Sequence, residues 1–172
     1  TVGSLGTDAE RTVFIRPVDG AKIAPVICYE SVFGAYVTQY IRKGANLIFV
    51  ITNDGWWGNT PGHRQHFTFS KMRAIETRRS IARSANTGIS AFINQRGDVF
   101  QKTKYWEPAV IRQVINANDK ITIYVKYGDY IARLSAFVAV FLLLIAISFR
   151  LTPTSLRPPD RVWRRGKPGK LW

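Results

Sequence analysis

The chain of 172 residues has only one cysteine, Cys28, which excludes a disulfide bond within it. Only two histidines are present, His63 and His66, and no second cluster of metal-type ligands accompanies them, so we expect no metal centre. Acidic residues are also few, with 11 Asp and Glu against 25 Lys and Arg and a formal net charge of +14. No RNA- or DNA-binding signature accompanies that charge, so we expect no nucleic-acid partner.

Cys28 follows a predicted strand and precedes a predicted helix. The apolar run over residues 23–27 indicates a buried strand, and apolar side chains then recur at helical spacing, which predicts a helix over residues 31–42. The first amides of a helix are unpaired donors that carry partial positive charge, and a thiol held there becomes a thiolate nucleophile more readily. Cys28 could equally be a small buried core residue, and the spacing alone leaves both interpretations open.

A second strand is predicted at residues 47–51, whose unbroken apolar run is typical of a strand covered on both faces. Strand, helix and strand then form a right-handed βαβ unit. The loop over residues 52–59 leaves the carboxyl end of this strand, where ligands bind in open α/β sheets, and Cys28 lies at the same edge. Its adjacent Trp56 and Trp57 either pack on the sheet or wall a pocket for an apolar or acyl group.

The remaining pattern completes an α/β domain. Residues 12–15 and 21–27 predict a hairpin, residues 61–84 a helix, and residues 89–93 and 99–101 a second hairpin. Residues 110–114 and 121–127 predict strands or an extended return path. Within the predicted helix, we expect Glu76 to form ion pairs with nearby arginines: Arg73, Arg79 and Arg83. The two histidines near its start could be ligands or a base, although local hydrogen bonding at the start of the helix is the simpler interpretation.

The last quarter of the chain predicts a membrane anchor. Residues 130–149 are almost wholly apolar, which suits a transmembrane helix if Arg133 extends to the interface. A buried core helix is the alternative, but the run has no polar face. From Arg150 to the C-terminus there are seven basic residues and one aspartate, and by the positive-inside rule this tail is cytoplasmic. Its four prolines predict an extended, disordered tail.

Several motifs in order resemble the apolipoprotein N-acyltransferase family of the nitrilase, or carbon–nitrogen hydrolase, superfamily. The resemblance begins near Arg16 and continues through the apolar helix. The motifs that carry it are Cys28-Tyr29-Glu30, residues 52–58 (TNDGWWG), Gln65-His66, residues 73–76 (RAIE), residues 83–89 (RSANTGI) and Gly97-Asp98. The resemblance implies the C-terminal part of an αββα sandwich with a Glu-Lys-Cys triad. We therefore expect residues 1–128 to belong to the catalytic domain, 129–150 to a transmembrane helix and 151–172 to a basic cytoplasmic tail.

The same resemblance assigns roles to individual residues. It implies that Cys28 is the nucleophile, and that Tyr29 and Glu30 are needed for activity, Glu30 by ordering the site and Tyr29 by positioning a loop or substrate. It places Asn53, Trp56 and Trp57 at the substrate, with the tryptophans in contact with lipid. The implied reaction moves an acyl chain from a phospholipid through a Cys28 thioester to the N-terminal amine of a diacylglyceryl-cysteine apolipoprotein, without metal or organic cofactor.

The chain departs from the family in its N-terminal part. The family's base Glu and its Lys precede the cysteine by many residues, whereas only 27 residues precede Cys28 here, and neither Glu10 nor Lys22 fits those roles. We therefore expect the chain to be the C-terminal part of a longer, multi-pass inner-membrane protein whose catalytic domain faces the periplasm. Two alternatives remain: an amidase acting on a small soluble C–N substrate, and a non-catalytic membrane-anchored module.

Overall fold

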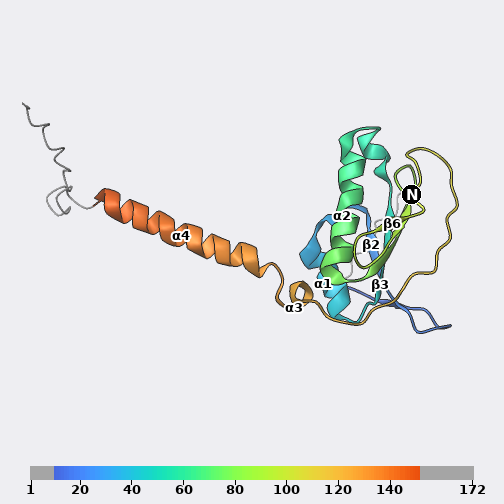
Figure 1. Ribbon diagram of the computed structural model, residues 1–172, viewed down its shortest axis with the longest axis horizontal. Helices are drawn as coiled ribbons and strands as arrows, with labels where there is room; N and C mark the ends of the chain where they lie inside the picture. Colours follow the sequence, from blue (N-terminus) through green and yellow to red (C-terminus); the bar gives the residue numbers. More distant parts are fainter. Residues whose placement is uncertain (1–9, 152–172) are drawn as a thin grey trace, which may run out of the picture. The chain divides into compact units, whose positions relative to one another are not determined.

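The computed structural model describes residues 10–151 and contains one six-stranded sheet with the strands in sequence order (Figure 1). The strands are β1 (Phe14–Ile15), β2 (Lys22–Ile27), β3 (Leu47–Thr52), β4 (Ser80–Ala85), β5 (Ala91–Ile93) and β6 (Val99–Phe100). The central strands β2, β3 and β4 run parallel, while β1, β5 and β6 pair antiparallel. The predicted βαβ unit and both predicted hairpins are confirmed.

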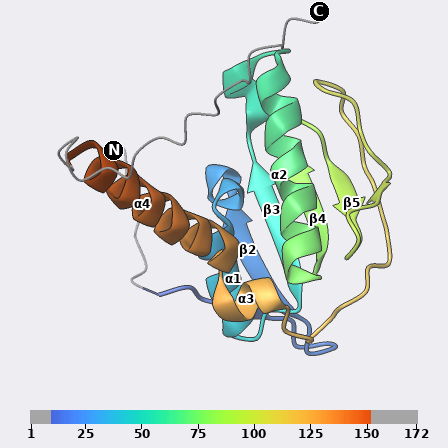
Figure 2. The same cartoon turned by 60° about the vertical axis from the view of Figure 1, so that its left-hand side comes forward.

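Three α-helices cover one face of this sheet (Figure 2). They are α1 (Gly34–Arg42), α2 (Pro61–Thr77) and α3 (Ile123–Tyr127), and two short 3-10 helices follow β2 and β3, η1 (Cys28–Val32) and η2 (Asp54–Trp57). Alternate strand residues point toward the helices, and these are the buried ones, for example Val26, Ile48 and Ile81. They pack against Val37 of α1 and Phe67 of α2, so the core lies between the helices and the sheet.

The opposite face of the sheet is more open. Ile27 and Ile51 pair across β2 and β3 and are 50% and 53% exposed, and Phe100 of β6 is 42% exposed. An αββα sandwich packs two sheets face to face, with helices on the outside. The described residues therefore supply one helix layer and one sheet layer, as the resemblance implies for the C-terminal part of such a sandwich.

Three sequence-based boundaries were wrong. The helix predicted from residue 31 is split into η1 and α1, because residues 28–32 form a 3-10 turn first. The helix predicted over residues 61–84 ends at Thr77, since Arg78 adopts a left-handed backbone with φ of 53° and the chain enters β4. Residues Ile123–Tyr127 form a helix rather than a strand, with the Thr122 hydroxyl accepting a hydrogen bond from the amide of Val125.

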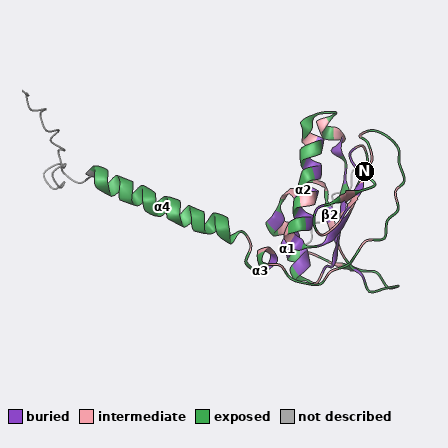
Figure 3. Ribbon diagram, viewed as in Figure 1, coloured by how far each residue is buried: buried purple, intermediate pink, exposed green. Residues whose placement is uncertain are grey.

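Helix α4 (Tyr130–Leu151) belongs to a second unit of the chain, which is divided from the first after Tyr130. Its stretch Tyr130–Arg150 is 21 residues long and apolar enough to cross a membrane, by length and composition. Its side chains are exposed from residue 131 to 150 (Figure 3), unlike those of the core helix that was the alternative. The predicted basic tail lies outside the described residues.

Candidate functional site

Cys28 lies at the carboxyl edge of the parallel strands, as predicted. It is the first residue after β2, and because Ile27 pairs with Ile51 of β3, Cys28 lies beside Thr52. Thr52 Oγ1 lies 3.3 Å from Cys28 Sγ, within hydrogen-bond distance of a sulfur atom, and the cysteine is half-buried. The helix that begins at Cys28 is a 3-10 helix of only five residues, so the structure does not supply the long helix dipole that the sequence pattern predicted.

The backbone of Cys28 is unusual. Its φ of 48° lies in the left-handed region, which is rare for a residue other than glycine and costs about 1–3 kcal/mol. Such strain persists only where surrounding contacts hold it, and it is concentrated at active sites. The conformation turns the chain sharply from β2 into η1 and leaves the thiol partly accessible at the sheet edge.

Glu30 stabilises this turn through hydrogen bonds. Its Oε2 accepts a hydrogen bond from the Ile27 amide over 2.8 Å, and its Oε1 accepts one from the Tyr36 hydroxyl. Burial and then the hydrogen bond to Glu30 raise the pKa of Tyr36, so this hydroxyl keeps its proton and remains a donor. The carboxylate therefore ties the end of β2 to α1, which fits the ordering role that the resemblance implies for Glu30.

Tyr29 lies on the outer side of the turn and is 55% exposed. Its ring packs edge-on against Phe33, with centroids 5.7 Å apart, and stacks near His66 at 6.2 Å. The Tyr29 side chain is thus partly exposed at the residue next to Cys28.

The two tryptophans after β3 occupy different environments. Trp57 packs inward, with its ring centroid 5.0 Å from that of His66 and its side chain over Gly62. Trp56 is 83% exposed. Asn53 holds the same loop, because its Oδ1 accepts hydrogen bonds from the Gly55 amide and the Thr87 hydroxyl, each over 3.1 Å. Trp57 therefore packs within the protein, whereas the Trp56 ring is accessible to an apolar group.

We expect the two tryptophans to differ on truncation. Trp57→Ala removes packing around His66 and should destabilise the protein by about 1–3 kcal/mol. Trp56→Ala should change stability by no more than about 0.5 kcal/mol, because its side chain buries little surface. Thermal unfolding of the two variants measures the difference, and equal shifts would contradict this assignment of inward and outward rings.

A buried ion pair lies beneath the turn, and the sequence patterns did not predict it. Asp54 of η2 accepts a hydrogen bond from Arg83 Nη2 of β4 at Oδ2, over 2.8 Å, and both side chains are 0% exposed. Arg83 also donates to Ser70 Oγ over 2.9 Å and to the Ile89 carbonyl over 3.1 Å. On its other side, Asp54 Oδ1 lies 2.9 Å from His66 Nδ1.

The charges of this pair follow from its contacts. Burial alone would raise the pKa of Asp54, but the hydrogen bond from His66 and the charge of Arg83 outweigh it, and the pKa is lowered. Burial lowers the pKa of Arg83, opposed by Asp54, yet a guanidinium starts so high that it stays charged. Asp54 is therefore a carboxylate at neutral pH. The signal in the sequence that could have identified Asp54 was its position in the loop after β3, at the edge of the sheet where ligands were predicted to bind.

The three arginines that were predicted to pair with Glu76 have different partners. Arg73 forms the expected ion pair with Glu76, at 2.9 Å from Nε to Oε2. Arg79 instead donates to the carbonyls of Ala45, Thr77 and Lys120, and Arg83 pairs with Asp54. The interpretation that Glu76 pairs with all three arginines was therefore right only for Arg73.

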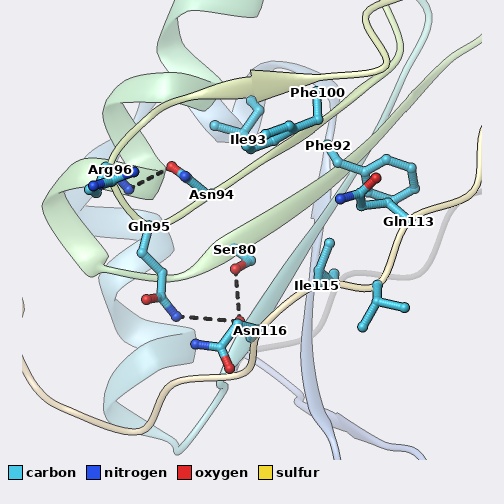
Figure 4. A pocket seen from close by; sticks show the side chains of 11 residues that line it. Ser80, Phe92, Ile93, Asn94, Gln95, Arg96, Phe100, Gln113, Ile115 and Asn116 are labelled. Carbon is cyan, nitrogen blue, oxygen red and sulfur yellow. Dashed lines mark hydrogen bonds between the residues drawn. The ribbon is translucent and has the colours of Figure 1, made fainter.

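A cavity of about 380 Å³ lies elsewhere in the domain, between β4–β6 and an extended segment over residues 113–116 (Figure 4). The Asn116 carbonyl accepts hydrogen bonds from Ser80 Oγ over 2.7 Å and from Gln95 Nε2 over 3.3 Å. Ser80 begins β4, whereas Cys28 follows the end of β2, and the two strands run parallel. The cavity therefore lies toward the other edge of the sheet, and none of the predicted site residues lines it.

The chain matches the sequence pattern of the carbon-nitrogen hydrolase family over residues 4–120. It is 35% identical over 125 residues to an apolipoprotein N-acyltransferase of Chlorobaculum tepidum, covering 73% of this chain and 24% of that protein. It is 45% identical over 98 residues to the enzyme of the same name from Allorhizobium ampelinum, covering 57% of this chain and 18% of that protein. The chain thus spans about a quarter or less of the length of these curated relatives.

The fold has solved counterparts. A carbon-nitrogen hydrolase from Helicobacter pylori G27 superimposes with a TM-score of 0.57 at 12% sequence identity, covering 78% of this chain and 50% of that one. At this identity the likeness concerns the fold alone. It agrees with one sheet and one helix layer of a larger sandwich.

Proposed function

Because the chain belongs to the carbon–nitrogen hydrolase family, we propose that Cys28 is the nucleophile of an acyltransferase that moves a fatty acyl chain from a phospholipid to an apolipoprotein. The observation that carries the proposal is the geometry of Cys28: a half-buried thiol on a left-handed backbone, at the carboxyl edge of a parallel sheet, in contact with Thr52. The names of the relatives favour acyl transfer to an apolipoprotein over hydrolysis of a small amide.

The reaction would proceed in two balanced halves. The Cys28 thiolate attacks the ester carbonyl of the phospholipid, and the tetrahedral oxyanion collapses with cleavage of the ester C–O bond. The lysophospholipid alkoxide leaves and takes up the proton that the thiol had given to the base, and a thioester remains on Cys28. The N-terminal amine of a diacylglyceryl-cysteine protein then attacks the thioester, so a C–N bond forms, the C–S bond breaks and the amine gives its proton to a base. The resemblance assigns the base to a Glu and oxyanion binding to a Lys, neither of which we assign within this chain.

The surroundings of Cys28 suit such substrates. Trp56 is exposed on the loop after β3 and offers an apolar ring to an acyl chain. Tyr29 offers a half-exposed phenol beside the thiol. We further propose that α4 crosses the inner membrane with its basic tail in the cytoplasm, which puts Cys28 on the periplasmic side.

Intact mass spectrometry tests the proposal directly. The native protein, purified in detergent and incubated with phospholipid, should gain the mass of one fatty acyl group. Hydroxylamine should remove that mass, because it cleaves thioesters, and Cys28→Ala should never acquire it. Addition of a diacylglyceryl-cysteine peptide should discharge the acyl group to the peptide amine.

The other outcomes point to the alternatives. Failure of folded wild-type protein to gain an acyl mass would overturn the acyltransferase proposal. Turnover of a soluble amide without lipid would then support the amidase, and no covalent chemistry at Cys28 would support a non-catalytic membrane-anchored module.

A further inference from the structure

Two side chains that lie beneath the turn reach Cys28 at two different atoms. Thr52 Oγ1 lies 3.3 Å from Cys28 Sγ, and His66 Nε2 lies 3.1 Å from the Cys28 carbonyl oxygen. Both side chains also contact the same atom of a third residue, because Thr52 Oγ1 and His66 Nδ1 each lie 2.9 Å from Asp54 Oδ1. One buried carboxylate therefore supports both contacts to the cysteine.

The protons on His66 follow from its neighbours. Asp54 is ionised and only accepts hydrogen bonds, so Nδ1, which faces it, carries a proton. Nε2, the other ring nitrogen, lies 3.1 Å from the Cys28 carbonyl oxygen and 3.0 Å from Ser31 Oγ. Ser31 Oγ in turn donates to the same carbonyl over 2.8 Å. Arg83 Nη2 donates to Asp54 Oδ2 over 2.8 Å and also lies 3.1 Å from His66 Nδ1.

This arrangement explains how the left-handed backbone of Cys28 is held. Ser31 Oγ donates to its carbonyl, His66 Nε2 contacts the same oxygen and Thr52 Oγ1 contacts its sulfur, so the peptide and the thiol are both fixed. His66 is itself held in place because it is 2% exposed and packs against the rings of Tyr29 and Trp57. A nucleophile that is fixed in advance loses less freedom on reaching the transition state.

We propose that Asp54 and His66 are positioning residues for Cys28: Asp54 orients His66 and Thr52, His66 fixes the Cys28 carbonyl, and Thr52 fixes its sulfur. This rests on the proposed function of Cys28 as the nucleophile. It adds a requirement within the described residues that is separate from the Glu and Lys implied by the resemblance.

His63 provides a matched control for His66. It lies one turn earlier on α2, is equally buried at 2% exposed, and also stacks on an aromatic ring, that of Tyr105 at 4.3 Å. No hydrogen bond of the described residues joins it to Cys28, Thr52 or Asp54. A general loss of packing in α2 would thus affect both histidine variants alike.

The test measures two rates on the native protein in detergent: acylation of Cys28 at saturating phospholipid, and alkylation of Cys28 by iodoacetamide. His66→Asn and Thr52→Val should each lower the acylation rate by about tenfold or more, with the phospholipid concentration for half-maximal rate unchanged. Thr52→Ser restores the hydroxyl and should recover the rate to within about twofold of wild type. His63→Asn should keep the wild-type rate.

The two rates separate the inference from the proposed function. If wild type forms no thioester but alkylation falls in His66→Asn and Thr52→Val and recovers in Thr52→Ser, the positioning role stands and the acyltransferase proposal fails. Wild-type alkylation and acylation rates in both variants would overturn the inference. It would equally fail if His63→Asn were as slow as His66→Asn, or if Thr52→Ser were as slow as Thr52→Val.

Discussion

Arg83→Met is expected to destabilise the protein by about 3–5 kcal/mol, because it removes one partner of a fully buried ion pair. The Asp54 carboxylate would keep its contacts from Thr52 and His66 but lose the guanidinium at 2.8 Å. Two further acceptors of Arg83, Ser70 Oγ and the Ile89 carbonyl, would also lose their donor. Thermal unfolding should show a decrease of roughly 10 °C for a loss of this size.

Two controls separate this effect from the mere loss of charge. Arg96 forms an ion pair with Asp98 at 3.2 Å, but its side chain is 79% exposed, so Arg96→Met should change stability by no more than about 0.5 kcal/mol. The double variant with Asp54→Asn and Arg83→Met removes both buried charges and should recover part of the loss. Equal effects of Arg83→Met and Arg96→Met would contradict the buried pair.

Arg83→Met should also make the stability of the protein more sensitive to acid. Because the folded pKa of Asp54 is lowered, its ionisation stabilises the fold above the unfolded pKa, and this stabilisation disappears as the pH falls through the folded pKa. Arg83 is one cause of that lowering, so in Arg83→Met the acid loss of stability should begin at a higher pH. Unfolding temperatures measured across acidic pH would show the shift, and an unchanged acid profile would contradict it.

Gly88→Ala should destabilise the protein by about 3 kcal/mol or more, which is nearly as much as Arg83→Met. A Cβ on Gly88 would overlap the Asp54 carboxylate and lie 2.6 Å from its Cγ. Asp54 cannot move away without losing Arg83 and His66, since the pair is enclosed at 0% exposure. We therefore expect a lower unfolding temperature together with slower acylation of Cys28, whose support depends on Asp54.

Gly20 offers a comparison for that variant. It has a positive φ of 69°, but nothing lies within 4 Å of the position that a Cβ would occupy. Gly20→Ala should cost only the backbone strain, about 1 kcal/mol, and leave acylation unchanged. If Gly88→Ala were no more destabilising than Gly20→Ala, the close approach of Gly88 to Asp54 would be wrong.

The edge of the sheet could be predicted from the sequence because its signals are local. An unbroken apolar run identifies β3, and an apolar run before Cys28 identifies β2. Two parallel strands then bring Cys28 and the loop after β3 together. Strand β4 was missed because its sequence, SIARSA, includes the charged Arg83, which disguises a buried strand position.

The sequence by itself determined the βαβ order, the position of Cys28 after β2 and the apolar helix α4, since each depends on the spacing of neighbouring residues. Only the tertiary structure determined which residues support Cys28 from beneath. Asp54, His66 and Arg83 come from η2, α2 and β4, and each alone reads as an ordinary polar residue. Burial makes them partners, because a buried charge or imidazole must find hydrogen bonds wherever the fold brings them together.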